Sequence, residues 1–551
     1  MQTNPLEPNS SIALKALEYF SSAACSLVGR SSVKFEAASH WARLAQDINH
    51  SSTSCAYVSG VNLISELAWP GSLVENRHYQ IRKVRPFIIN ASIFAIQIGQ
   101  CTTAVEWIEQ GCSIIWSQLL QLRALFAKLK ERYPIQGMEL ESLSARLTVQ
   151  TQATAPDIFL NDGLTLEVAK DFHEIAEQRR RLINEIRKLP GYEKFLLPKQ
   201  FSEISMAATD NPVILLISSN IQADALVLIP GLSDDVLHIP LPFLNDRVLQ
   251  ALLGIRRKWR QNPDVKEEAF RGILLMLWIR VAKPIVDGLA LTVNSSSYKN
   301  LLGFYRSFPF LPIHAAGDYS SNAPLGSKLS EYAISSYTPS LTALLEAQSS
   351  YSNQPRDLKV LAVAQPSTLP GFETELDYIQ KYAGDSITVK TLKGSNATVA
   401  RVAEEMRRHE WAHFACHGTQ DSQDPLQSGL VLESNSKLTI NDIITMQLPP
   451  KGLAFLSACQ TATGDENLST EAVHLAAGML SAGYRSVIAT MWSISDSHAP
   501  QVANDVYRFL FKDGKNDSTQ VAEALHYAIQ NLQLNTQPSF ATWVPFIHIG
   551  V

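Results

Sequence analysis

The chain is poor in cysteine, in excess charge and in long apolar runs, and each shortage excludes a class of protein. Its six cysteines lie scattered among 551 residues, without the paired spacing of a disulfide framework or a zinc site. The formal net charge is −5 with both signs intermixed, and no basic stripe or polybasic segment is present. We therefore expect neither a nucleic acid nor a membrane as a partner.

Apolar runs such as Gly272–Ile279 are too short to span a bilayer. The first ten residues lack the cationic start and the apolar core of a secretion signal. Together with the unpaired cysteines, these absences predict a cytoplasmic protein. Apolar residues make up 46% of the chain and charged residues 18%, which is typical of a globular protein, and no motif calls for a metal ion or an organic cofactor.

Residues 1–132 have the pattern of paired helices. Small residues and bulky apolar residues recur there at spacings of three and four, for example in Ala38–Ala45 and Ala91–Gly99. Antiparallel helix pairs of the tetratricopeptide (TPR) type use small residues at their close contacts. We therefore predict an all-α, TPR-like region over 1–132 and a more polar helical linker over 133–195. The charged triplet Arg179–Arg181 of this linker is interpreted as an exposed helix face.

Strand patterns begin after residue 196. Short β-branched runs at 212–217 and 223–230 predict strands, helical patterns follow around 245–258 and 264–286, and a serine-rich linker closes this α/β region at 350. Over 351–551 strands and helices alternate, and Asn396 is expected to cap the helix that follows it. The alternation predicts a mainly parallel sheet flanked by helices. Its strands are expected at 358–364, 386–392, 411–416, 453–458 and 486–490.

Two reactive side chains stand at the ends of these predicted strands. His417 directly follows the run Trp411–Cys416, and Cys459 directly follows the run Leu453–Ala458. Ligands of parallel sheets bind beyond the carboxyl ends of the strands, so we expect both side chains at one edge. An imidazole can take the proton of a thiol or stabilise its thiolate, which is the minimum requirement for a cysteine peptidase.

Two neighbouring residues refine this hypothesis. Gly418 has no side chain, so a substrate carbonyl can approach its backbone, and its N–H and that of Cys459 are candidates for an oxyanion hole. A cysteine on an apolar strand is more often a small core residue, and this alternative stands beside the catalytic one. Cys416 points away from His417 in the strand alternation and is interpreted as core.

The last 200 residues contain an ordered set of motifs: His413–Gly418, Asp424–Leu430, Leu456–Thr461, Gly478–Gly483, Ser486–Asp496 and Trp543–Gly550. With these motifs the region resembles the CHAT domain, a branch of the caspase–separase clan of cysteine peptidases. Segments 310–317 and 335–340 look like the N-terminal half of a CHAT region, and 104–116 looks like the helices before CHAT domains in fungal TPR-CHAT proteins.

The resemblance implies a caspase-like catalytic half over 351–551 and an N-terminal CHAT half over 196–350. It implies His417 as the general base and Cys459 as the nucleophile. Trp492 and Asp496 would line the substrate pocket, with Asp496 pairing with a basic side chain as in separase-like enzymes. The structural alternatives are that Trp492 seals the sheet edge and that Asp496 caps the helix beginning near His498.

The function implied is that of a cysteine endopeptidase that cleaves a protein substrate, with the N-terminal helices recruiting a regulatory protein. By family analogy, the setting would be regulated cell death or defence, such as activation of a gasdermin-like pore-forming protein. The alternative is a non-catalytic CHAT scaffold whose helical region binds a protein partner.

Overall fold

The fold is known from a computed structural model, which describes residues 11–26, 31–67, 74–112, 129–153, 164–219, 222–244, 248, 267–293, 299–305, 312–349, 358–365, 371–385, 387–419, 421, 425–446, 448–457, 475–492, 494, 498–512, 517–536 and 538–551. The chain divides into two compact units. One comprises 1–98 and 106–199, and the other comprises 99–105 and 200–551. The finer boundaries expected at 132 and 350 stay predictions.

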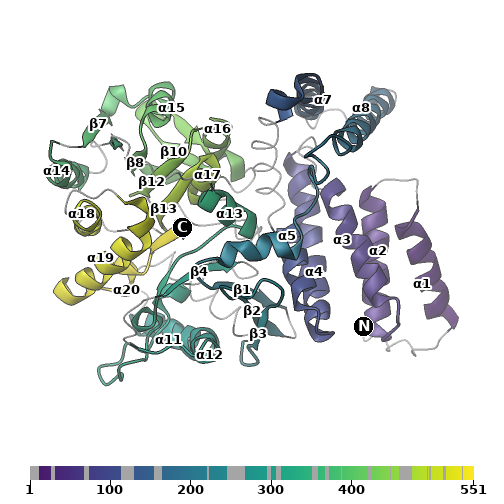
Figure 1. The fold of residues 1–551 in the computed structure, drawn as a ribbon, viewed down its shortest axis with the longest axis horizontal. Helices are drawn as coiled ribbons and strands as arrows, with labels where there is room; N and C mark the ends of the chain where they lie inside the picture. The colour runs from purple at the N-terminus through teal and green to yellow at the C-terminus, as the bar shows by residue number, and fades with distance from the viewer. Residues whose placement is uncertain are drawn as a thin grey trace. The chain divides into compact units, whose positions relative to one another are not determined.

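The first unit is built from helices (Figure 1). Consecutive helices pack as neighbours, and small residues occupy their contacts: Ala38 and Ala42 on α2 are almost completely buried beside Trp41. A Cβ at Gly60 would overlap the ring of Phe87. The expectation of helices with small residues at close contacts is confirmed, while the TPR-like assignment stays a prediction. The bounds are α1 Ser11–Ala24, α2 Ser31–Asp47, α3 Thr53–Leu67 and α4 Val74–Gln97. The next helix, α5 (Cys101–Cys112), has its first residues assigned to the other unit.

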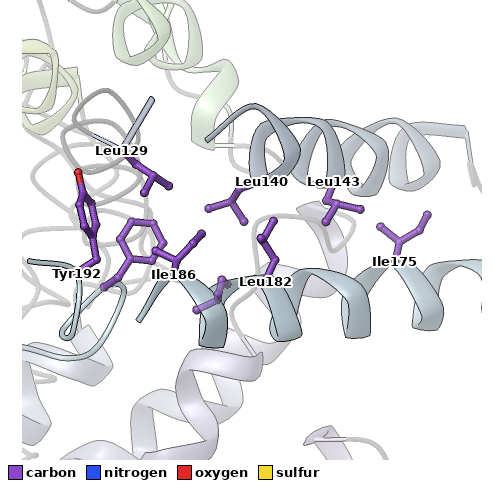
Figure 2. Close-up of a cluster of buried hydrophobic side chains, with 9 residues drawn as sticks. Leu129, Leu140, Leu143, Ile175, Leu182, Ile186 and Tyr192 are labelled. Carbon is purple, nitrogen blue, oxygen red and sulfur yellow. The ribbon is translucent and has the colours of Figure 1, made fainter. Parts of the chain in front are cut away.

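A second helix pair, α7 (Pro134–Ala153) and α8 (Leu164–Ile186), packs around its own apolar cluster. Figure 2 shows Leu140, Leu182 and Ile186 pointing toward one another between the two helices. The triplet on α8 does not form one exposed face, because Arg179 is only 5% exposed whereas Arg180 and Arg181 are exposed. Burial lowers the pKa of Arg179 to about 9, and its Nε donates to Ser144 Oγ. The exposed-face interpretation was therefore wrong for Arg179.

The second unit begins with a mixed sheet. The runs predicted as strands form β1 (Val213–Ser218) and β2 (Ala223–Leu228), both fully buried and paired antiparallel. The order of its described strands is β3-β2-β1-β4-β5, and β4 pairs in parallel with both β1 and β5. The remaining elements are β3 Leu237–Pro240, α11 Glu267–Leu277, the π-helical turn Trp278–Ala282, α12 Lys283–Gly288, β4 Lys299–Tyr305 and β5 Ala333–Ser335.

The other sheet of this unit is the predicted, mainly parallel one. Its described strands have the order β14-β13-β12-β8-β6-β7, and all their pairings are parallel except that of β14 with β13. The strands are β6 Lys359–Ala364, β7 Thr388–Lys393, β8 Trp411–Ala415, β12 Lys451–Leu456, β13 Tyr484–Thr490 and β14 Phe546–Gly550.

Helices flank this parallel sheet, as predicted. Helices α14 and α18 lie side by side, and α13 and α17 contact β13 (Figure 1). The helix expected after Asn396 begins at Val399, and its N-cap is Thr398, whose Oγ1 accepts from the N–H of Arg401. Asn396 instead accepts from the guanidinium of Arg401, so the capping prediction was wrong by two residues. The helices are α13 Leu341–Ser349, α14 Gly371–Ala383, α15 Val399–Arg408, α16 Ile440–Thr445, α17 Leu475–Ala482, α18 Ala499–Leu510, α19 Val521–Thr536 and α20 Phe540–Trp543.

The two sheets are joined by the residues that follow β5. The N–H of Tyr337 donates to the carbonyl of His548, and the N–H of Gly550 donates to the carbonyl of Tyr337. This short parallel pairing connects the edge of the mixed sheet to β14 at the edge of the parallel sheet. None of the helices that the structure describes is both long and apolar enough to cross a bilayer.

Candidate active site

The candidate site lies at the carboxyl ends of β8 and β12, which are neighbours in the parallel sheet. Both strands are completely buried, because in a sheet covered by helices successive side chains face apolar neighbours on either side. Their register pairs Phe414 with Leu456. His417 comes three residues after Phe414, and Cys459 comes three residues after Leu456. The last paired residues of the two strands thus lie at matching distances in sequence from the two predicted catalytic residues.

His417 itself belongs to a small antiparallel sheet. It opens β9 (His417–Thr419), which pairs with β10 (Gly429–Val431), and β10 pairs in turn with β11 (Lys437–Thr439). Within this sheet His417 is opposite Val431 and Gly418 is opposite Leu430. Both His417 and Gly418 are half-buried. The side chain of His417 therefore has partial access to solvent, as a catalytic base requires.

Cys416 directly precedes His417 and faces the protein interior. Its side chain is completely buried, and burial raises the pKa of its thiol well above the usual range. A thiol in that state is a poor nucleophile. The interpretation of Cys416 as a core residue is confirmed.

Cys459 and Asp496 lie outside the described residues. The last described residue after β12 is Ser457, which is buried. The oxyanion role of the Gly418 and Cys459 backbone, and the pocket role of Asp496, stay predictions.

Trp492 follows β13 and is buried, with 3% of its surface exposed. Its indole N–H donates to the carbonyl of Ala541, and its ring meets that of Phe270 edge to face at 5.8 Å. Phe270 also stacks on Phe540. The indole thus closes an aromatic cluster beside the end of β13, and its role as a pocket wall stays a prediction.

A buried polar cluster beneath the site was not anticipated from the sequence. Glu375, on α14, accepts hydrogen bonds from His413 Nε2 at 2.6 Å and from Ser457 Oγ at 3.0 Å. His413 Nδ1 lies 3.1 Å from the hydroxyl of Tyr507, on α18. A signal was present, because Glu375 interrupts the apolar stripe of Phe372, Leu376 and Ile379 on its helix.

Residues 305–551 match the family model described as the CHAT domain. The chain contains a CHAT domain. The match begins within β4 and includes β5, α13 and the whole parallel sheet. The family and the α/β architecture predicted from the motifs are both confirmed. A comparison with curated proteins finds no match.

Some solved structures match the chain with low similarity. A complex of the pro- and mature domains of Porphyromonas gingivalis RgpB matches with 12% identity and a TM-score of 0.33, covering 52% of this chain and 70% of that one. Two structures of the Saccharomyces cerevisiae separase–securin complex match with 10% and 9% identity and TM-scores of 0.39 and 0.38. They cover 95% and 98% of this chain, which spans 45% and 48% of theirs. These similarities assign no substrate or partner to the chain.

At two positions in the motifs of this CHAT domain, steric constraints explain why the residue is glycine. A Cβ on Gly429 would overlap the carbonyl oxygen of Leu438 and lie 2.8 Å from the Cα of Thr439. Gly429 thus permits the close approach of β10 and β11 that supports His417. Gly483 adopts φ +116 between α17 and β13, where L-residues are strained, and confirms the helix end predicted there.

Proposed function

We propose that the CHAT domain is a cysteine endopeptidase in which His417 is the general base and Cys459 is the nucleophile. The observation that carries this proposal is the register of β8 and β12, which ends three residues before each of them. Because the carboxyl ends of parallel strands meet at one edge of a sheet, this register favours a thiol–imidazole pair there. His417 is half-buried, whereas Cys416 is completely buried and its thiol is therefore a poor nucleophile. Both observations support the same assignment.

In this proposal, His417 takes the proton of the Cys459 thiol, and the thiolate attacks the carbonyl carbon of the scissile peptide. Negative charge develops on the carbonyl oxygen, and the backbone N–H groups of Gly418 and Cys459 stabilise it. The imidazolium then protonates the amine as it departs, and the acyl group remains on Cys459 as a thioester. Water, deprotonated by the same imidazole, releases the acid product and regenerates the thiol.

The substrate proposed is a protein cut after a basic residue. Asp496 supplies a negative charge in the segment after β13, and Trp492 supplies apolar surface in the same segment. The helical unit is proposed to recruit or regulate, through a protein partner. By analogy with the family, the biological setting proposed is regulated cell death or defence, including activation of a gasdermin-like pore-forming protein.

The test is alkylation of the full-length chain with a thiol-directed electrophile, followed by mass mapping of each cysteine. We expect Cys459 in the wild type to react at least about tenfold faster than in His417→Ala, because loss of the base lowers the thiolate fraction. Cys55 is free and exposed, and serves as the internal reference whose rate stays constant in both proteins.

The same experiment can contradict the proposal. If Cys459 reacts no faster than buried Cys416, or equally fast in the wild type and in His417→Ala, the peptidase assignment is wrong. Co-expression with candidate substrates gives the second arm, in which Cys459→Ala abolishes cleavage. Cleavage that survives this substitution places the activity elsewhere. Binding of a partner without any Cys459-dependent cleavage favours the non-catalytic scaffold.

A further inference from the structure

The cluster beneath the site joins the two strands that lead to the proposed catalytic residues. His413 lies on β8 four residues before His417, and Ser457 follows β12 two residues before Cys459. Both donate to the same carboxylate, that of Glu375, through different oxygens. His413 is opposite Phe455 in the register of the two strands. One side chain of α14 therefore connects the ends of two adjacent strands.

The cluster is buried, so its hydrogen bonds do not compete with water. The exposed fraction is 3% for Glu375, 0% for His413 and 7% for Ser457. A buried carboxylate without partners would be costly, and a bidentate set of donors fixes its position. Ring contacts hold the imidazole of His413, with Phe455 at 4.8 Å and Tyr507 at 5.8 Å between centroids.

The proton positions follow from the partners. An ionised carboxylate only accepts, so the Ser457 hydroxyl and the His413 Nε2–H both donate to Glu375. Burial, with the nearby charge of Glu375, raises the pKa of Tyr507 well above its usual value, so its hydroxyl stays protonated and donates to His413 Nδ1. The donors thus run from Tyr507 through His413 to Glu375, which also accepts from Ser457.

The same residues do not form a hydrolytic triad of their own. Ser457 contacts the carboxylate instead of the imidazole, so these residues lack the serine–histidine hydrogen bond on which a triad depends. His413 is completely buried and has no access to a substrate. The arrangement suits a support, not a reaction centre.

We propose that Glu375 is a positioning residue that holds the ends of β8 and β12 together and thereby sets the distance between His417 and Cys459. This inference rests on the proposed peptidase function and extends it to a residue on a separate helix, 42 positions before His417 and 84 before Cys459 in the sequence. Without the carboxylate, the two strand ends lose their shared anchor, and the thiol and imidazole are no longer held for proton transfer.

The chain offers a matched control on the same helix. Glu373 lies two residues before Glu375, is half exposed, and pairs on the surface with Lys393. Glu373→Gln therefore makes the same chemical change without touching the cluster. The test variants are Glu375→Ala, Glu375→Gln and Ser457→Ala. The last removes only one hydroxyl and keeps the test valid where Glu375→Ala does not fold.

We expect Glu375→Ala and Ser457→Ala to lower kcat for cleavage about 10- to 100-fold, with KM within about twofold, because misplacement affects the reaction more than substrate binding. Glu375→Gln should recover much of the loss, since its amide can accept from Ser457 and donate to His413 Nε2 once the ring proton moves to Nδ1. Hydrogen exchange of segments 411–417 and 451–457 should accelerate in the Ala variants. Glu373→Gln should match the wild type in every measurement.

The readouts separate the two proposals. If wild-type Cys459 shows no His417-dependent alkylation, the peptidase proposal fails, while hydrogen exchange still decides whether Glu375 holds the strand ends. The positioning proposal is overturned if Glu375→Ala or Ser457→Ala keeps the wild-type kcat and exchange. It is also overturned if Glu375→Gln is as impaired as Glu375→Ala, because charge and not position would then be the cause.

Discussion

Two roles compete for the side chain of Asp496, and one substitution separates them. The pocket role needs its negative charge, whereas the capping role needs only an oxygen that accepts from a helix N–H. The N-cap of α18 is His498, two residues after Asp496 in the sequence, so Asp496 precedes the helix as the capping role requires. Asparagine caps helices about as well as aspartate does.

Asp496→Asn should therefore abolish a preference for Arg or Lys before the cut while leaving the thermal unfolding midpoint unchanged. The measurement is a peptide-library cleavage profile of the wild type and the variant, with Asp496→Ala as the control that removes both roles. An aliphatic preference in the wild type, or a basic preference that persists in the variant, would rule out the charge as the pocket determinant.

Residue roles could be predicted from the sequence only where local pattern determines them. The core position of Cys416 followed from strand alternation and is confirmed. Asn396 and Thr398 are both good caps, and the choice of Thr398 depends on where the turn Gly394–Asn396 ends. Burial of Arg179 and of Glu375 depends on a neighbouring helix or strand, which no local pattern specifies. Long-range partners decide such cases.

At the scale of elements, the β9–β10–β11 sheet is what holds His417 after β8 ends. Its strands have three residues each, too short to give a hydrophobic period, so the sequence did not predict them. Five strands of the parallel sheet, β6, β7, β8, β12 and β13, were predicted to within about two residues, because all but the partly exposed β7 are buried apolar runs bounded by turn residues. The edge strand β14 was not predicted as a strand.

Gly429→Ala tests this small sheet. The new Cβ would overlap Leu438, so the backbone of β10 must shift, and we expect a loss of about 1–3 kcal/mol in the free energy of unfolding. Because β10 pairs directly with β9, the alkylation rate of Cys459 should fall as well. Thermal unfolding and the alkylation assay with Cys55 as reference measure the two effects.

The control is Gly272→Ala on α11, where a Cβ would meet nothing within 4 Å. Alanine favours a helix over glycine by up to about 1 kcal/mol, so this variant should be as stable as the wild type or more stable. Equal stability and equal Cys459 reactivity in both variants would show that close approach at Gly429 does not matter for the site.

At the scale of the whole molecule, the mixed and parallel sheets are tied together by residues far apart in sequence. Ser336 Oγ donates to the carbonyl of Gly550 at 3.0 Å, so it accepts from His548 Nδ1 at 2.7 Å. These contacts span 214 and 212 residues. Alternating strands and helices predict that a parallel sheet forms, but they contain no information on which distant edge it meets. Strand order and this junction therefore had to come from the structure.

His548 makes the junction sensitive to acid. Burial lowers its pKa to about 3, against an ordinary value of about 6.5, so the folded protein keeps it neutral while the unfolded chain takes up a proton. Its stabilising contribution is complete above pH about 6.5 and declines as the pH falls toward about 3. In that interval the decline is about 1.4 kcal/mol per pH unit.

His548→Asn removes this titration, and the Asn amide can still donate to Ser336. The free energy of unfolding of the wild type should therefore fall more steeply than that of the variant, by about 1.4 kcal/mol per pH unit between pH about 6 and about 4. Urea unfolding across this range measures both slopes, and His40→Asn, which removes an exposed histidine of α2, should keep the wild-type slope. Parallel slopes for wild type and His548→Asn would mean that the ring takes up its proton over the same pH range in the folded and the unfolded protein. The junction between the two sheets would then carry a buried charge, and acid would not weaken it through His548.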